Sequence, residues 1–354
     1  MEFGPLASRN ADNVELIQVQ TNVESSLDGK TIKLEGHKDA ITSARFSPDG
    51  QLICTGSRDK MALIWKGTNS CDFLGGFNTK SPIIDLQFHD FYNDDDYSQN
   101  LLLLTSQASG FISVWDLNKG VQQRRLGNTH SRKFSHRMPV NSLSLFPNNS
   151  QPNLVCSASD DKFLKIWDIR VNKPVCEYHH SFELTSCCAQ TEDSVLFGSV
   201  DGCLYSLNIT NFMPQLDEEL SSKLNEDRHS DILLSISMSG SGQQISTCSS
   251  DKSMKLWNVQ PFVPPNQSRL VGHFFSQFNN SEMDIYRSSI NSEETLVAMG
   301  GSKLLFIWNI FTKKLIFALP GHLGNVTCAQ FHPKDPNIIL SGGNDALGFV
   351  NEIK

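Results

Sequence analysis

The chain has 354 residues, of which 39% are hydrophobic and 19% charged, and its formal net charge is −8 at pH 7. An acidic chain of this kind does not bind phosphates over its whole surface. No apolar run reaches the roughly 18 residues of a membrane span, and the first ten residues lack a signal-peptide core. The nine cysteines are scattered without a C-x-x-C pair, which argues against a zinc site or disulfide framework and is typical of a reducing compartment.

The first residues carry no sustained pattern, and a strand pattern begins after them. Residues 1–28 are polar, and we expect a flexible tail. Short alternating strands are predicted at 31–34, 41–46, 52–57 and in a segment that ends at Trp65. Ser47-Pro48-Asp49-Gly50 separates two of them as a turn, because proline presets φ and glycine accepts a positive φ.

One phrase recurs along the chain, and residues 156–168 show it most clearly. A strand of small residues leads to an acidic turn, and a second strand ends in Trp167-Asp168. All five tryptophans occupy this one position, so the chain is a repeat protein. With this position as the marker, seven units end at Trp65, Trp115, Trp167, Leu207, Trp257, Trp308 and Asn351.

The first unit resembles a known repeat. Gly36-His37, Ser47–Gly50, Thr55–Asp59 and Ile64-Trp65 resemble the signature of a WD repeat. The resemblance implies an all-β fold, a seven-bladed β-propeller over residues 29–354. The seventh unit lacks an outer strand, whereas 31–34 is a surplus strand. We therefore expect this N-terminal strand to complete the last blade and close the ring, which removes exposed strand edges.

Histidines recur four residues before the first strand in four units. The candidate sets are His37 with Thr55 or Ser57, Asp59 and Trp65; His136 with Ser157, Asp161 and Trp167; His229 with Thr247, Asp251 and Trp257; and His322 with Asp345. A hydroxyl, a histidine and an aspartate also make a hydrolase triad, but a nucleophile needs one exposed copy beside an oxyanion hole. The resemblance implies instead a buried hydrogen-bond relay that is structural.

Other chemical motifs are weak. Gly240-Ser241-Gly242 occupies a hairpin position without a following helix, so it is interpreted as a turn and not as a nucleotide loop. Asp94–Asp96 lacks the spaced ligands of a calcium loop. We expect no catalytic residue, no metal and no cofactor, and a central channel without an acid, base or metal cluster.

Partner contacts are expected on one ring face and on long insertions. The residue before each turn aspartate should point outward: Arg58, Asp160, Val200, Ser250 and Asn344. Insertions are predicted as loops at 90–99, 121–138, 212–228 and 273–282. The second of these ranges, 121–138, is basic: it holds Arg124, Arg125, Arg132, Lys133 and Arg137 without an acid. It either contacts RNA or an acidic partner, or is a solvated connector.

The C-terminal third of the chain resembles one particular group of WD-repeat proteins. Residues 255–264, 304–309, 319–322 and 331–339 are similar to the WD-repeat subunits of the U5 small nuclear ribonucleoprotein. This resemblance implies a nuclear, non-catalytic scaffold that binds large spliceosomal proteins, has at most minor RNA contact and acts as a monomer within a large complex. Unit two has Ser109 and unit six has Ser302 where the turn aspartate belongs, and unit four lacks its tryptophan.

A second function remains open. Trp167-Asp168-Ile169-Arg170 matches a W-D-x-R signature by which some propellers dock on a cullin–RING ligase adaptor. In this alternative Asp168 and Arg170 would contact the adaptor, and the chain would be a substrate receptor for ubiquitylation. Another kind of WD-repeat scaffold is a further possibility, because many propellers carry this signature without that partner.

Overall fold

A computed structural model of the chain describes residues 29–67, 70–93, 98–127, 134–147, 153–264, 267–275 and 286–353. The expected tail at 1–28, the acidic run Asp94–Asp96, and Arg132 and Lys133 lie outside the described residues.

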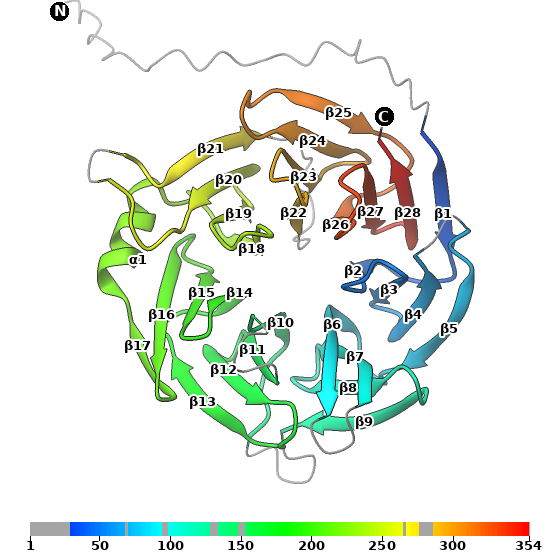
Figure 1. Cartoon of the computed structure of the whole chain (residues 1–354), viewed down its shortest axis with the longest axis horizontal. Helices are drawn as coiled ribbons and strands as arrows, with labels where there is room; N and C mark the ends of the chain where they lie inside the picture. Colours follow the sequence, from blue (N-terminus) through cyan, green and yellow to red (C-terminus); the bar gives the residue numbers. More distant parts are fainter. Residues whose placement is uncertain are drawn as a thin grey trace, which may run out of the picture.

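The described strands form seven four-stranded antiparallel sheets arranged in a ring, which confirms the seven-bladed propeller (Figure 1). Blade 1 contains β2 (Ile41–Phe46), β3 (Leu52–Ser57), β4 (Met61–Lys66) and β5 (Phe73–Asn78). Blade 2 contains β6 (Ile83–Asn93), β7 (Ser98–Gln107), β8 (Ile112–Asp116) and β9 (Val121–Leu126). Blade 3 contains β10 (Val140–Leu145), β11 (Leu154–Ser159), β12 (Phe163–Asp168) and β13 (Pro174–His179).

The remaining blades follow the same order from the axis outward. Blade 4 contains β14 (Leu184–Thr191), β15 (Ser194–Ser199), β16 (Leu204–Thr210) and β17 (Met213–Leu216). Blade 5 contains β18 (Leu233–Met238), β19 (Gln244–Ser249), β20 (Ser253–Asn258) and β21 (Leu270–Phe275). Blade 6 contains β22 (Ser288–Ile290), β23 (Leu296–Gly300), β24 (Leu305–Asn309) and β25 (Leu315–Leu319). Blade 7 contains β26 (Val326–Phe331), β27 (Ile338–Gly343), β28 (Leu347–Glu352) and, on its outside, β1 (Thr31–Glu35).

Strand β1 closes the ring as expected. It pairs antiparallel with β28, with Thr31 opposite Asn351 and Leu34 opposite Gly348. Figure 1 shows β1 beside β28 on the outside of this blade. Leu34 is only 2% exposed and joins a core cluster that includes Ile41 of blade 1. The N-terminal strand therefore contributes buried apolar surface to the joint between the last blade and the first.

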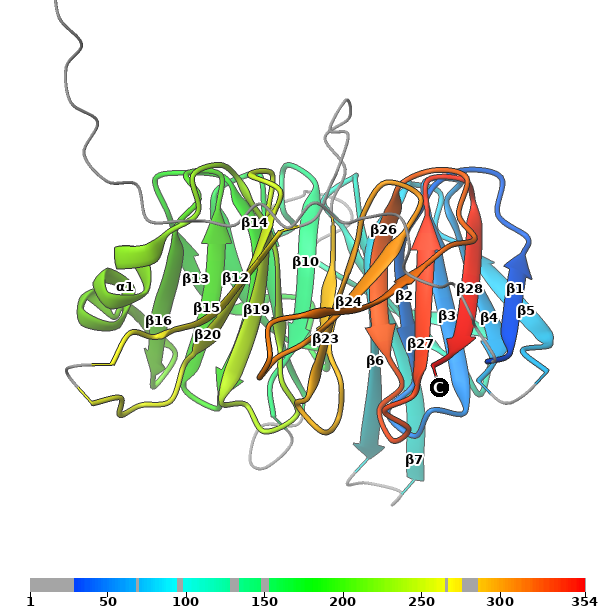
Figure 2. The same ribbon diagram turned by 90° about the horizontal axis from the view of Figure 1, so that it is seen from above.

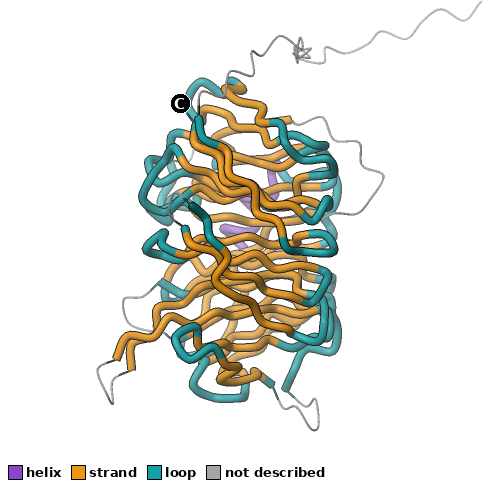
Figure 3. Tube along the Cα trace, turned by 90° about the vertical axis from the view of Figure 1, so that its right-hand side faces the viewer, coloured by secondary structure: helices purple, strands orange, loops and turns teal. Residues whose placement is uncertain are grey.

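The core lies between neighbouring blades. Trp167 and Val155 of blade 3, for example, belong to the same buried cluster as Leu104 and Val114 of blade 2. Alternate residues of each strand face opposite sides of the sheet, so both faces of a blade bury apolar side chains against its neighbours. Seen from the side, the sheets stack around the ring and the loops gather at its two edges (Figure 3).

All four predicted loops contain regular structure. The insertion at 90–99 extends a hairpin, since β6 and β7 remain paired out to Asn93 and Ser98, and this hairpin projects from one ring face (Figure 2). Residues 121–126 form β9, the outer strand of blade 2, and β21 continues through 273–275. The loop prediction was wrong at 121–126 because β9, with its polar and charged residues, lacks the alternation that a half-buried strand shows.

The insertion at 212–228 is also structured. It holds β17, helix α1 (Glu218–Leu224) and a short 3-10 turn (Asn225–Asp227). Asp217 caps the helix by accepting a hydrogen bond from Leu220 N at 3.0 Å, and Leu224 is buried. Within the described ranges no helix is long and apolar enough to cross a membrane.

Candidate interaction surfaces and their supporting geometry

Blade 3 shows the complete relay that the sequence predicted. Trp167 donates its indole N–H to Ser157 Oγ at 2.8 Å, and Ser157 Oγ lies 2.8 Å from His136 Nε2. His136 Nδ1 in turn lies 2.9 Å from Asp161 Oδ2. The serine is fully buried and bonded on both sides, so no substrate carbonyl can approach it. The geometry links two strands and a turn and offers no nucleophile.

The same chain of contacts recurs in blades 1 and 5. Trp65 and Trp257 donate to Thr55 and Thr247, and these hydroxyls lie 2.8 Å from the Nε2 atoms of His37 and His229. The Nδ1 atoms of the two histidines meet Asp59 and Asp251. Thr55, and not the alternative Ser57, is the hydroxyl in blade 1, since Ser57 Oγ donates to Asp39 O.

Blade 7 keeps the histidine, the aspartate and the hydroxyl of the relay but lacks the tryptophan. His322 lies 3.1 Å from Asp345 Oδ1 and 3.0 Å from the hydroxyl of Ser341. Asn351 takes the place of the tryptophan and accepts a hydrogen bond from Thr31 Oγ1 at 2.9 Å. The departure from the repeat therefore occurs where the closing strand β1 binds.

Burial sets the protonation of the relay in blade 3. Loss of hydration lowers the pKa of His136, against the opposing effect of Asp161, so the imidazole is neutral at pH 7. Burial would raise the pKa of Asp161, but hydrogen bonds from His136, Arg137 N and Phe163 N prevail and lower it to about 2. The pair is therefore a neutral imidazole donating to a carboxylate.

Blade 4 contains a fifth histidine that the sequence analysis missed. His180 lies four residues before Leu184, the same spacing as in the other units, but Leu207 and Phe197 replace the tryptophan and the hydroxyl. The imidazole packs instead against Tyr205, with ring centroids 4.6 Å apart. Tyr205 donates its hydroxyl to Asp201 Oδ2 at 2.7 Å. The spacing could have revealed His180, whereas its aromatic partners follow no repeat signature.

The five residues before the turn aspartates differ in exposure. They lie on the face of the ring that carries His37 and the turn at Asp59, which we call the relay face. Arg58 is exposed, whereas Asp160, Val200, Ser250 and Asn344 are half-buried. Asp160 accepts a hydrogen bond from Asn141 Nδ2 at 2.6 Å, and Asn141 also donates to Leu184 O of blade 4. Asp160 thus helps to join two blades at this face.

Asp168 and Arg170 bind each other. Arg170 Nη2 lies 2.7 Å from Asp168 Oδ2, and the Arg170 backbone N–H donates to the same carboxylate. Burial would raise the pKa of Asp168, but these hydrogen bonds from Arg170 keep it below its usual value. Both groups that the ligase alternative needs are therefore engaged in a local ion pair.

The basic residues at 121–138 do not form one loop. Arg124 and Arg125 lie half-buried on β9, and the Arg125 guanidinium stands 4.8 Å from the ring centroid of Phe111. Arg137 is exposed on the relay face, where its backbone N–H donates to Asp161. Arg124 and Arg125 therefore belong to an outer strand, whereas Arg137 lies in the connection that leads to β10.

A buried ion pair crosses the ring axis and was not expected from the sequence. Asp85 of β6 is fully buried, and its Oδ2 atom lies 3.4 Å from Nη1 of Arg287, the residue before β22. Arg287 also donates to the carbonyl groups of Ile84 and Asn141 at 3.2 and 3.0 Å. A side chain from blade 6 therefore binds blades 2 and 3 on the other side of the channel.

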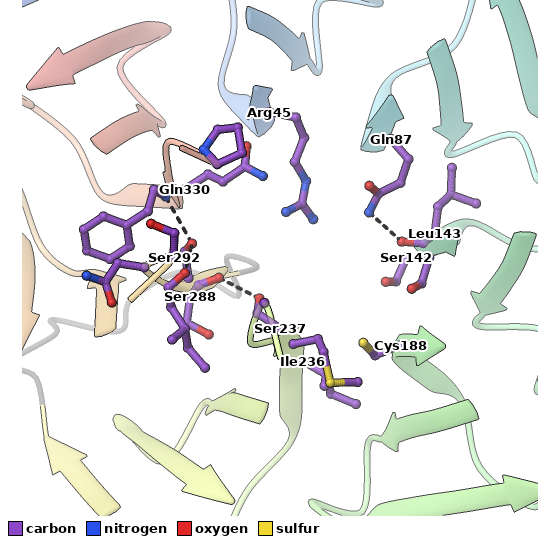
Figure 4. Close-up of a pocket in the computed structure, with 18 of the residues that line it drawn as sticks. Arg45, Gln87, Ser142, Leu143, Cys188, Ile236, Ser237, Ser288, Ser292 and Gln330 are labelled. Carbon is purple, nitrogen blue, oxygen red and sulfur yellow. Dashed lines mark hydrogen bonds between the residues drawn. The ribbon is translucent and has the colours of Figure 1, made fainter. Parts of the chain in front are cut away.

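On one side of this ion pair the channel widens into a cavity of about 570 Å³. It opens on the face where the innermost strand of each blade turns into the second, which we call the hairpin face and which includes the turn at 47–50. Its lining residues include Arg45, Gln87, Ser142, Ser237 and Gln330 (Figure 4). No cluster of three or more His, Cys, Asp or Glu side chains that could hold a metal occurs in the described part of the chain.

The closed ring of seven four-stranded blades with His–Asp–Trp relays defines a WD-repeat β-propeller. The repeat family described as "WD domain, G-beta repeat" matches residues 29–66, 128–168, 221–258 and 313–347. The U5 small nuclear ribonucleoprotein 40 kDa protein of Dictyostelium discoideum is 30% identical, over 94% of this chain and 87% of that protein. The human protein of the same name is 25% identical, over 93% of this chain and 85% of its own length. The pre-mRNA-splicing factor cwf17 of Schizosaccharomyces pombe is 26% identical, over 93% of this chain and 89% of its own length. The chain belongs to the WD-repeat family that contains these U5 40 kDa proteins.

Proposed function

We propose that the chain is a non-catalytic interaction scaffold of the U5 small nuclear ribonucleoprotein and supports pre-mRNA splicing in the nucleus. The observation that carries this function is similarity over 94% of the chain to a U5 40 kDa protein, which spans every blade. The relay hydroxyls are buried and bonded, so the geometry favours binding over catalysis.

The partners that we propose are large protein subunits of the same particle, with RNA contact indirect or minor, and the chain is a monomer within that complex. A closed ring has no free inner edges, so its faces and projecting hairpins are the surfaces left for partners. The relay face, with Arg58 and Asp160, and the β6–β7 hairpin on the opposite face are the candidate contacts.

Affinity purification of the tagged protein from nuclear extract tests this function. We expect U5 RNA to be recovered together with the large splicing GTPase and helicase. Recovery of a cullin–RING adaptor without U5 RNA would contradict the proposal and support a role for Asp168 and Arg170 in docking. The intramolecular Asp168–Arg170 pair and the names of the relatives do not favour that second function.

The candidate contacts are tested one by one in the same purification. Asp160→Arg should reduce partner recovery, while Asp160→Asn, which keeps an acceptor for Asn141, should leave it intact. Charge reversal at Arg124 and Arg125, with Arg137 reversed as a separate variant, tests RNA contact by ultraviolet crosslinking. Unchanged crosslinking in all variants would leave the basic residues as solvated connectors.

A further inference from the structure

The central cavity has one lining residue whose charge stands out. Arg45 of β2 lines it with a side chain that is 18% exposed, and Figure 4 shows the guanidinium pointing into the cavity. Its Nε atom has no hydrogen-bond partner among the described residues. Its Nη2 atom lies 3.8 Å from Asp85 Oδ1, which is too long for a hydrogen bond. The arginine therefore enters the cavity with most of its donors unused.

The carboxylate of Asp85 is already saturated. It accepts hydrogen bonds from Ser43 Oγ at 3.0 Å and from Leu143 N at 2.9 Å, and it forms the ion pair with Arg287. Two guanidinium groups thus share a single buried carboxylate, which leaves a surplus of one positive charge at the base of the cavity. A surplus charge in a channel walled by protein attracts an anion more strongly than the same charge at an open surface.

The walls of the cavity supply neutral groups and no competing acid. Its lining contains hydroxyl and amide side chains but neither aspartate nor glutamate. Glu294, on a neighbouring hairpin, accepts a hydrogen bond from Ser241 N at 2.7 Å and is engaged there. Gln330 uses its Oε1 atom to accept from Phe46 N, which leaves its amide N–H groups as donors.

We propose that this cavity on the hairpin face binds an acidic side chain of a partner protein, with the Arg45 guanidinium as the principal donor to its carboxylate. Arginine presents two parallel donors that match a carboxylate, and a cavity of about 570 Å³ has room for an acidic side chain. This proposal rests on the proposed function in one respect: the acidic side chain that enters the cavity belongs to a protein partner of the scaffold.

The test measures how tightly a short peptide with central aspartate and glutamate residues binds to the purified full-length protein. Its analogue with asparagine and glutamine at those positions is the matched probe. We expect the acidic peptide to bind, the amide peptide to bind at least about tenfold more weakly, and Arg45→Gln to remove that difference. Lys66→Gln, at an exposed cation of the same blade that does not line the cavity, should change nothing.

A second pair of variants keeps the test decisive if Arg45→Gln folds poorly. A side chain at Gly240, on the rim of the cavity, meets no atom within 4 Å, so substitutions there are tolerated sterically. Gly240→Glu should weaken the acidic peptide several-fold through like-charge repulsion, whereas Gly240→Gln should not. Equal binding of both peptides, or equal effects of the two Gly240 variants, would overturn the proposal. Recovery of U5 RNA is measured separately, so failure here and failure of the scaffold function are distinguishable.

Discussion

Asp85 and Arg287 are separated by half the ring, yet their charged groups lie 3.4 Å apart across the channel. Strand pairing holds each blade together, and apolar packing joins neighbours, but this contact joins blade 2 to blade 6 directly. Asp85 Oδ2 also accepts from Leu143 N of blade 3. Its Oδ1 atom accepts from Ser43 Oγ of blade 1, so one buried carboxylate connects four blades.

Replacing Arg287 by methionine should destabilise the ring strongly. The change leaves the Asp85 carboxylate buried beside Arg45 alone, and breaking a buried pair in this way costs about 3–5 kcal/mol of unfolding free energy. Urea denaturation of the single variants and of Asp85→Asn/Arg287→Met measures the coupling. The double variant should lose less than the sum of the singles. Simple additivity would show that the two residues act independently.

Removing a relay carboxylate should have a smaller effect. Asp161→Ala leaves His136 Nδ1 and two backbone N–H groups without their acceptor. An unsatisfied buried group costs about 1–3 kcal/mol, which chemical denaturation would detect. Asp193→Ala, at an exposed turn of blade 4, should stay within about 0.5 kcal/mol of the parent. Equal losses in the two variants would argue against a structural role for the relay.

Because His89 is buried, we expect the free energy of unfolding to decrease in mild acid. This histidine is 2% exposed on β6, and burial lowers its pKa from 6.5 to about 4. Below pH 6.5 the imidazole of His89 binds a proton in the unfolded chain but stays neutral in the folded chain. The stability that neutral His89 allows is therefore fully present above pH 6.5 and is lost as the pH falls toward 4. The loss amounts to at most about 3 kcal/mol.

Melting temperatures measured between pH 7 and pH 4.5 check this prediction. His89→Leu should flatten the pH dependence, because the titrating group is gone. His179→Gln, at an exposed position on β13, is the matched control and should follow the parent. A His89→Leu curve parallel to the parent would assign the acid sensitivity to other groups, such as His136 and His229, whose pKa values burial also lowers.

Substitutions at two neighbouring residues of the closing strand β1 should differ in their effect on stability. Leu34→Ala removes a buried side chain from the joint between blades 7 and 1, and such truncations cost about 2–5 kcal/mol. Lys33→Ala, on the exposed side of the same strand, should be nearly neutral. Limited proteolysis and light scattering should show opening and association of the Leu34 variant, because loss of β1 bares the edge of β28. Equal behaviour of the two variants would mean that closure does not depend on this packing.

The repeat signature predicted the ring well because its markers are local. Trp65, with its turn and hydroxyl, specifies a strand pair within about 30 residues. The Asp85–Arg287 pair carries no such signal. Asp85 and Arg287 belong to different repeats and do not occupy the same position within them, so the repeat pattern does not relate them. Charge alone does not show that two side chains meet across an axis. The start of helix α1 could have been predicted from the sequence, because Asp217 followed by Glu218 and Glu219 is the pattern of a helix start.

The pairing of β1 with β28 also has a consequence for synthesis. Strand β28 is made some 300 residues after β1, so a growing chain carries its first strand without a partner until the last blade has left the ribosome. Six blades can form in order, each on the one before it, but the circle closes only in a single late step. During that interval the free edge of β1 can pair with other chains.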